Sequence, residues 1–251
     1  MEVVRWYTPV VKARLYNDDC ITGAKQIETE SIDLGIHDPP FGLGEGSFGS
    51  QYNRKKTAII KGYVEAPEDY EKFSFEWIAE AARVLKPTGT LYIVSGWSWE
   101  RDVLNAVAAN HLLLLNKIIW EYPFGVYCKK QFVSSHYEIL RCAKTDGVKF
   151  NKGCRYSTTK EQYADMQDVW HINKEYHRSV EKNCNKLPTE LVRKMIQYSS
   201  DPGDTVADFF LGNGTTADCC YELDRDVIGF EINLNAFTRI QQRMLGNGVL
   251  R

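Results

Sequence analysis

Strand-like and helix-like segments alternate along this sequence of 251 residues, and the alternation limits the fold more than any other feature. Short β-rich apolar runs are followed by longer segments whose apolar residues recur at helical spacing. Such alternation predicts an α/β fold, with helices packed on both faces of a doubly wound, mostly parallel sheet. The strand-like runs are 15–19, 32–37, 90–94, 117–121, 136–142, 205–210 and 227–230, and the helix-like segments are 67–85, 99–109, 188–200, 215–221 and 233–246.

One segment, 144–185, interrupts the alternation. It is polar and lacks periodicity, so we expect an insertion that lies outside the main sheet. The chain then divides into residues 1–143, the insertion, and residues 186–251, and the two flanking parts form one domain of ordinary size. The basic, aromatic and histidine residues of the insertion include Lys149, Phe150, Lys152, Arg155, Tyr156, Lys160, His171, Tyr176, His177 and Arg178.

Composition excludes several classes of protein. The formal net charge is −2, so any nucleic-acid site must be a local basic patch. No apolar run is long enough to cross a bilayer, and the N-terminal residues do not resemble a signal peptide, so we expect a cytoplasmic protein. The seven cysteines form no Cys-x-x-Cys pair, which predicts buried or idle thiols instead of a zinc site or disulfides.

Asp38-Pro39-Pro40-Phe41 follows the predicted strand 32–37 and forms the first candidate site. The prolines fix φ and remove two backbone donors, so the carbonyl groups beside them face outward with little freedom. A carboxylate, an oriented carbonyl and an aromatic ring together can bind a flat heterocycle with an exocyclic amine. The alternative is a strand-to-loop turn with an incidental aspartate, since proline commonly ends strands.

The loop that follows, 42–64, is long and rich in glycine. Basic residues (Arg54, Lys55, Lys56 and Lys61) alternate there with aromatic ones. A long loop without regular structure inside a compact domain is usually functional. This composition favours a lid that contacts phosphates and bases over a solvated surface loop.

Gly212-Asn213-Gly214, between a predicted strand and a predicted helix, is the second candidate site. Glycine lets a backbone pass close to a ligand, because a Cβ would fill the space. Glu231 ends the next predicted strand, where doubly wound folds place a carboxylate that accepts hydrogen bonds from ribose hydroxyls. The third glycine of a dinucleotide-binding fold is missing, which disfavours a nicotinamide oxidoreductase and favours a nucleoside site without a diphosphate.

These motifs, in this order, resemble those of the S-adenosylmethionine-dependent DNA amino-methyltransferases of the beta class. Residues 38–41 resemble the family's catalytic Asp-Pro-Pro-aromatic tetrad, and 208–216 resemble its cofactor loop, Asp-Pro-Phe-x-Gly-Ser-Gly-Thr-Thr. The tetrad comes first and an insertion separates the two, which is the beta order. Similar stretches at 15–20, 83–87, 136–140 and 188–191 extend the resemblance over nearly the whole chain outside the insertion. The departures are Phe41 for tyrosine, Phe209 for proline, Asn213 for serine and Leu187 for lysine.

The resemblance implies a seven-stranded methyltransferase sheet in circularly permuted order, with S-adenosylmethionine as cofactor and double-stranded DNA as substrate. Phe41 would stack on a flipped base, while the Asp38 carboxylate and the Pro39 carbonyl accept hydrogen bonds from its amine. Methyl transfer would then be direct, without a metal or a covalent enzyme intermediate. The insertion would recognise the target sequence. The expected catalytic residues are Asp38, Pro39, Pro40 and Phe41, and the expected cofactor contacts are Asp19, Asp208, Phe210, Gly212, Asn213, Gly214, Thr215, Thr216 and Glu231.

Several functional alternatives stay open. The Asp-led tetrad favours adenine N6 as the target, because the family's cytosine N4 enzymes more often begin with serine. A silent methyltransferase-like subunit that only binds DNA or a partner chain is disfavoured by the intact tetrad and glycine loop. Related Pro-Pro-aromatic enzymes also act on RNA or protein. The sequence determines neither the recognition site nor a cognate restriction endonuclease, and the short insertion favours a homodimer.

Overall fold

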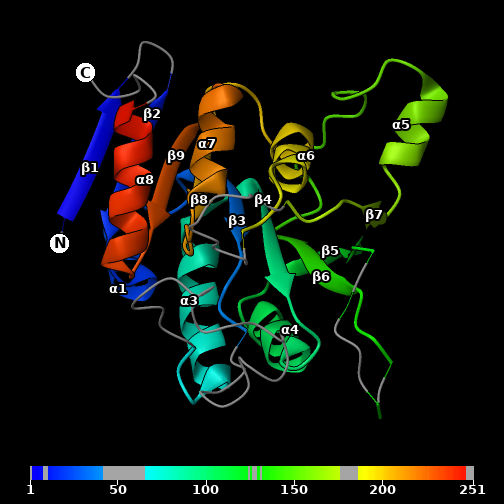
Figure 1. The fold of residues 1–251 in the computed structure, drawn as a ribbon, viewed down its shortest axis with the longest axis horizontal. Coiled ribbons are helices and arrows are strands. Elements are labelled where there is room, and N and C mark those ends of the chain that lie inside the picture. The colour runs from blue at the N-terminus through cyan, green and yellow to red at the C-terminus, as the bar shows by residue number, and fades with distance from the viewer. Residues whose placement is uncertain are drawn as a thin grey trace.

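The computed structural model describes residues 2–7, 11–41, 66–123, 125, 129–130, 132–175 and 186–246. These residues form a nine-stranded, mostly parallel sheet in the order β1-β2-β9-β8-β3-β4-β6-β5-β7 (Figure 1). The strands are β1 (Glu2–Tyr7), β2 (Lys12–Asn17), β3 (Ile32–His37), β4 (Leu85–Ser95), β5 (Leu113–Glu121), β6 (His136–Ala143), β7 (Val169–His171), β8 (Thr205–Asp208) and β9 (Asp226–Phe230).

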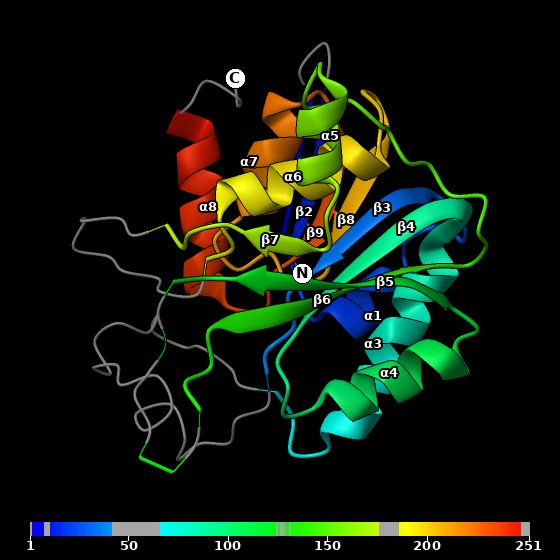
Figure 2. The same ribbon diagram turned by 90° about the vertical axis from the view of Figure 1, so that its right-hand side faces the viewer.

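Helices cover both faces of this sheet, which confirms the doubly wound prediction. Figure 2 shows α6, α7 and α8 on one side of the strands and α1, α3 and α4 on the other. Each face has its own apolar core, with Met195 of α6 in one and Trp77 of α3 in the other. None of the helices in the described residues is long and apolar enough to cross a bilayer. The helices are α1 (Cys20–Ala24), α3 (Tyr70–Val84), α4 (Glu100–Ala109), α5 (Thr159–Asp165), α6 (Thr189–Ser199), α7 (Thr215–Glu222) and α8 (Leu234–Gly246).

The strand order brings together segments that lie far apart in the sequence. β8, near the end of the chain, pairs in parallel with β3 on one side and with β9 on the other. Leu34 of β3 is in register with Val206 of β8, which is in register with Val227 of β9. Since the three strands run in the same direction, their carboxyl ends share one edge of the sheet.

Two edge strands extend the predicted sheet of seven. β1 pairs antiparallel with β2, and β7 pairs in parallel with β5, with Ile119 opposite Val169. β7 belongs to the insertion, so the prediction that 144–185 lies outside the main sheet is wrong. The reason is physical: β5 presents an open edge of N–H and C=O groups, and a three-residue strand is enough to pair with it.

Local hydrogen bonds explain where the observed strand ends differ from the predicted ones. The predicted strand 205–210 stops at Asp208, because the next two amide groups leave the ladder. The Phe209 N–H donates to His37 Nδ1 at 3.0 Å, and the Phe210 N–H donates to Asp208 Oδ1 at 2.9 Å. β4 starts at Leu85 instead of residue 90, since Leu85 is already in register with Ile32 of β3.

A polar network anchors the insertion to α6. Asp165, which ends α5, accepts hydrogen bonds from Lys194 Nζ at 3.0 Å, Tyr198 Oη at 2.7 Å and Arg155 Nε at 3.0 Å. The Lys194 ammonium also lies 4.6 Å from the centroid of the Trp170 ring. Lys194 is buried, so its charge depends on these partners.

Four basic residues of the insertion fall into two groups. Lys149 forms ion pairs with Asp201 and Asp204 at 2.7 and 2.5 Å, and Arg155 pairs with Asp165, so both are committed to the fold. Lys152 and Lys160 are exposed. Of these four residues, Lys152 and Lys160 are available to a partner without breaking the ion pairs given above.

Candidate active site

Three carboxylates lie at the carboxyl ends of three adjacent strands. Asp208 is the last residue of β8, Asp38 directly follows β3, and Glu231 directly follows β9. The parallel pairing of these strands brings the tetrad and the glycine loop to one edge of the sheet. In open α/β sheets, this edge is where ligands bind.

Burial makes this edge electrostatically unusual. It raises the pKa of Asp38 to about 8, that of Glu231 to about 7 and that of Asp208 to about 6. The charge of Asp208 raises the pKa of the other two further, and the Lys174 ammonium lowers the pKa of Asp38. Three carboxylates that are costly to ionise together favour a ligand that carries positive charge.

Glu231 fixes the position of the glycine loop. Its Oε2 accepts a hydrogen bond from the Gly212 N–H at 2.8 Å, and its Oε1 accepts one from the Asn233 N–H at 2.7 Å. Each oxygen retains a second lone pair with which to bind a ligand. The expected ribose-binding carboxylate therefore also has a structural role that its sequence position did not indicate.

The two glycines of the loop are required for different reasons. Both have positive φ, +52° at Gly212 and +75° at Gly214. A Cβ on Gly214 would lie 3.1 Å from Ile240 and 3.0 Å from Arg243, so the absence of a side chain here lets α8 pack closely, and the expected cofactor contact of Gly214 stays a prediction. A Cβ on Gly212 would meet only the Phe210 carbonyl oxygen, at 3.8 Å. Gly212 is thus the position where the backbone is open to a ligand.

The other residues of the loop contact neighbouring parts of the protein. Thr215 and Thr216 are buried in the first turn of α7. The Thr216 hydroxyl forms a hydrogen bond with the Asp208 carboxyl group. The Phe210 ring packs at 5.3 Å from the Trp77 ring, and the Asn213 carbonyl accepts a hydrogen bond from Arg243 at 2.6 Å. Contacts of these residues with a cofactor stay predictions.

Asp19 lies at the end of β2, next to β9 in the sheet. Its Oδ1 accepts hydrogen bonds from the N–H groups of Ile21 and Thr22, at 3.0 and 3.1 Å, so it caps α1. The capping role explains an acidic residue at this position. The expected ligand contact of Asp19 stays a prediction.

The tetrad directly follows β3, and its residues differ in their exposure. Pro39 is buried, while Asp38, Pro40 and Phe41 are half-buried. The Phe41 and Tyr137 rings are 5.3 Å apart. Gly96 lies beside the Phe41 ring, since a Cβ there would be in ordinary van der Waals contact with it at 3.6 Å.

His37 is a site residue that the sequence did not single out. It is buried directly before Asp38, and burial lowers its pKa to about 3, so it is neutral. Its Nδ1 accepts the Phe209 N–H at 3.0 Å, and thereby joins the end of β3 to the end of β8. A polar residue at the last position of a mostly apolar strand was the signal that could have found it.

A second unpredicted feature is a lysine surrounded by aromatic rings. Lys174 Nζ lies 4.1 Å from the ring centroid of Tyr122, 4.6 Å from that of Tyr137 and 5.8 Å from that of Trp120. The same Tyr137 contacts Phe41 of the tetrad. The insertion therefore contributes a charged side chain to the catalytic edge.

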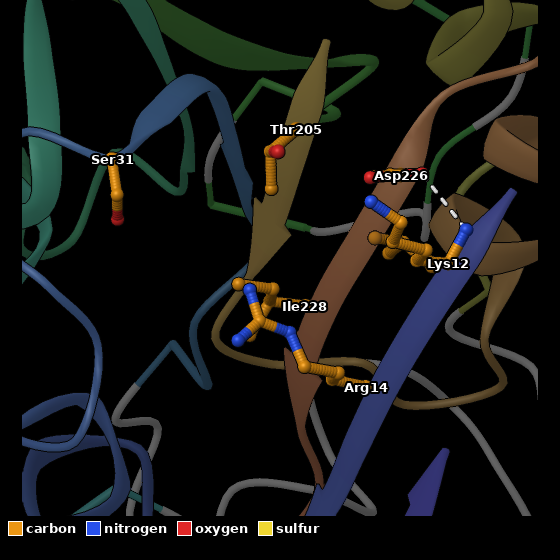
Figure 3. Close-up of a pocket in the computed structure, with 7 residues that line it drawn as sticks. Lys12, Arg14, Ser31, Thr205, Asp226 and Ile228 are labelled. Atoms are coloured by element: carbon orange, nitrogen blue, oxygen red, sulfur yellow. Dashed lines mark hydrogen bonds between the residues drawn. The ribbon is translucent and has the colours of Figure 1, made fainter. Parts of the chain in front are cut away.

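A cavity of about 500 Å³ lies elsewhere, at the amino ends of the strands (Figure 3). Thr205 and Asp226, the first residues of β8 and β9, line it with Lys12 and Arg14 of β2. Figure 3 shows the hydrogen bond between the Lys12 N–H and Asp226 Oδ1, which is 2.8 Å long. This cavity is at the opposite end of the strands from the carboxylates and is separate from the site.

Some predictions fall outside the described residues, namely the proposed lid at 42–64 and Tyr176, His177, Arg178, Cys128 and Cys184. Of the described cysteines, Cys154 is exposed and the other four are buried, and all five are free. His171 pairs with Glu121 at 3.0 Å. Within the described residues, no group of three or more His, Cys, Asp or Glu side chains is arranged to hold a metal ion.

Comparison with known proteins agrees with this geometry. Residues 32–242 match the model of a protein family described as DNA methylase, of the N6/N4 type. The chain is 30% identical over 246 residues to the type II methyltransferase M.HpaI of Haemophilus parainfluenzae, covering 92% of this chain and 74% of that protein. It is also 30% identical to M.BamHI of Bacillus amyloliquefaciens, of which it spans 56%.

Solved structures share the fold. The cytosine-N4-specific PvuII DNA methyltransferase superimposes with a TM-score of 0.73 at 17% identity, covering 92% of this chain and 86% of that one. The complex of M1.HpyAVI with S-adenosylmethionine gives a TM-score of 0.62 at 20% identity, covering 92% and 98%. Both likenesses support the methyltransferase α/β architecture.

Proposed function

This chain belongs to the N6/N4 DNA methylase family, and we propose that it transfers a methyl group from S-adenosylmethionine to the N6 amine of adenine in double-stranded DNA. The observation that carries the proposal is the meeting of the Asp38 tetrad and the glycine loop at the carboxyl ends of β3 and β8. A cognate restriction endonuclease is part of the proposal, because the relatives are type II methyltransferases.

The residues at this edge suit the cofactor. S-adenosylmethionine, the methyl donor of this family, carries a sulfonium and an ammonium group, and the site offers Asp38, Asp208 and Glu231. Glu231 would accept hydrogen bonds from the ribose hydroxyls, and Gly212 has no Cβ to block the approach of a ligand. When bound, the cofactor supplies an electrophilic methyl group, and its transfer to an amine releases one proton.

The tetrad would bind the target base. Phe41 offers a half-buried ring on which a flipped base can stack, backed by Tyr137. The Asp38 carboxylate and the Pro39 carbonyl accept hydrogen bonds from the two amine hydrogens, which makes the nitrogen lone pair available. Asp38 must be ionised for this role, because a carboxylate accepts at both oxygens whereas a carboxylic acid also donates.

Adenine N6 is favoured over cytosine N4 by the aspartate that opens the tetrad. Cytosine N4 is the second candidate, since the PvuII enzyme, which shares the fold, is cytosine-N4-specific. Both reactions require the same acceptors around an exocyclic amine, so only the product distinguishes them.

The test is to incubate the protein with S-adenosylmethionine labelled in the methyl group and unmethylated DNA, then to digest the DNA to nucleosides for mass spectrometry. We expect labelled N6-methyladenine. Labelled N4-methylcytosine would show that the target base is cytosine instead of adenine. A digest without labelled nucleoside would overturn the proposal. Asp38→Ala should abolish labelling while the cofactor still binds, whereas Asp146→Ala, at an exposed position, should not change it.

A further inference from the structure

Lys174, from the insertion, is held by contacts on both sides of it in the sequence. The Ile172 carbonyl accepts a hydrogen bond from Trp120 Nε1 at 2.8 Å. Glu175 accepts from the Thr189 N–H at 2.7 Å and from Lys186 Nζ at 3.2 Å. The backbone that carries Lys174 is therefore tied to β5 on one side and to the start of α6 on the other.

The side chain of Lys174 is held as well. Its ammonium lies within 6 Å of the ring centroids of Trp120, Tyr122 and Tyr137, the range of a cation–π interaction. Tyr137 also contacts Phe41, so the lysine and the predicted stacking ring share one neighbour. The ammonium is thus prearranged beside the tetrad.

We propose that Lys174 is a positioning residue of the methyl-transfer site, whose aromatic-bound ammonium favours the carboxylate form of Asp38, the form that accepts the target amine. The inference rests on the proposed role of Asp38. It adds that the insertion contributes to the chemistry of the site besides any part in recognising DNA.

The charges around Asp38 explain why such a residue is needed. Asp208, at the end of the adjacent β8, repels a negative charge on Asp38, and Glu231 lies beyond it after β9. His37 is neutral and provides no compensation. Within the part of the chain that the structure describes, the Lys174 ammonium favours the charged form of Asp38 and lowers its pKa.

The experiment measures the pH dependence of single-turnover methyl transfer by wild type and Lys174→Met at saturating cofactor and DNA. Methionine keeps the length and apolar stem of lysine but removes its charge. We expect the rate at pH 7 to fall by about tenfold, to recover as pH rises, and the midpoint of the acidic limb to move up by about one unit. Lys174→Arg, which keeps the charge, should restore the wild-type profile.

Several outcomes would overturn the inference. A rate that falls equally at every pH would indicate a structural role, and a raised KM for DNA with an unchanged pH profile would indicate a phosphate contact. Lys25→Met, at an exposed position directly after α1, is the matched control and should leave the profile unchanged. Unchanged affinity for S-adenosylmethionine, measured by calorimetry, would show that each variant is folded. Lys174→Gln, which also lacks the charge, is a second variant in which the pH profile should shift in the same way.

The Asp38→Ala variant separates the two proposals. If Asp38→Ala retains wild-type turnover, the proposed function itself fails. If Asp38→Ala is inactive and Lys174→Met has the wild-type pH profile, only the role of Lys174 fails.

Discussion

The Gly212 N–H donates a hydrogen bond to Glu231 Oε2 at 2.8 Å, so the loop after β8 and the carboxylate after β9 form one structural unit. Two residues that were each expected to contact the cofactor directly also hold each other in place. Loss of the carboxylate should therefore release the loop in addition to removing a ligand contact.

Glu231→Ala should weaken cofactor binding by about 30-fold, the equivalent of about 2 kcal/mol for a hydrogen bond to a charged group. Glu231→Gln should have a smaller effect, about tenfold, because its amide oxygen still accepts from one of the two N–H donors. Isothermal titration calorimetry with S-adenosylmethionine measures both. Glu222→Gln on α7, whose carboxylate pairs with Arg193, is the control. Unchanged affinity in both Glu231 variants would contradict the assignment.

Asp208 should make the protein less stable as pH rises. Its pKa is raised to about 6 in the folded state, mainly by burial, so the folded state holds the proton more tightly than the unfolded chain. This contribution to stability is complete below about pH 4 and is lost as pH rises through 6. Relative to Asp208→Asn, the free energy of unfolding of wild type should fall by about 2 kcal/mol between pH 4 and pH 7. Urea denaturation at both pH values measures it, and a difference that does not change with pH would refute it.

Alanine substitutions at three glycines with positive φ should separate the cost of backbone strain from the cost of steric contact between the new Cβ and its neighbours. Gly203, at φ +88° with no atom within 4 Å of the position that a Cβ would take, is the control for strain alone, about 1 kcal/mol. Gly212→Ala should cost about as much in stability and should also weaken cofactor binding. Gly214→Ala should cost roughly 2–3 kcal/mol, because its Cβ would also press on Ile240 and Arg243. Urea denaturation measures the free energy of unfolding of the three variants. Equal losses of stability would contradict the contact between the Cβ at position 214 and α8.

His37→Phe should destabilise the protein by about 2 kcal/mol, because the buried Phe209 N–H loses its acceptor. His136→Phe, at an exposed position of β6, is the control. In wild type, the His37 ring should show no titration above about pH 4 by NMR, since its pKa is about 3. A ring that titrates near pH 6.5 would show that it is exposed.

Much of the fold could be predicted from the sequence, because its longer helices have apolar residues at regular helical spacing. The helix over Tyr70–Val84 has Phe73, Trp77 and Ala81 on one buried face and Asp69 as its cap. The short edge strands β1 and β7 were missed, since each depends on an open neighbouring edge and not on its own pattern. The helix α1 was missed for a similar reason: its five residues are held by the Asp19 cap.

The candidate site was predicted where it is contiguous in the sequence and missed where it is assembled in space. The tetrad and the glycine loop are short motifs, and the structure brings them together as the strand order requires. Lys174 joins the site only because β7 pairs with β5 and places the insertion beside Tyr137. No local pattern around Lys174 encodes that pairing.

The anchoring of the insertion to α6 affects how enzymes of this kind can be recombined. A chimera that exchanged only the insertion for that of a relative would leave Lys194 buried without Asp165, and an unpaired buried charge is costly. The graft would also remove Lys174 from the catalytic edge. A functional exchange must therefore carry α6 along with the insertion and retain a cation at position 174, so that specificity and catalytic competence are inherited together.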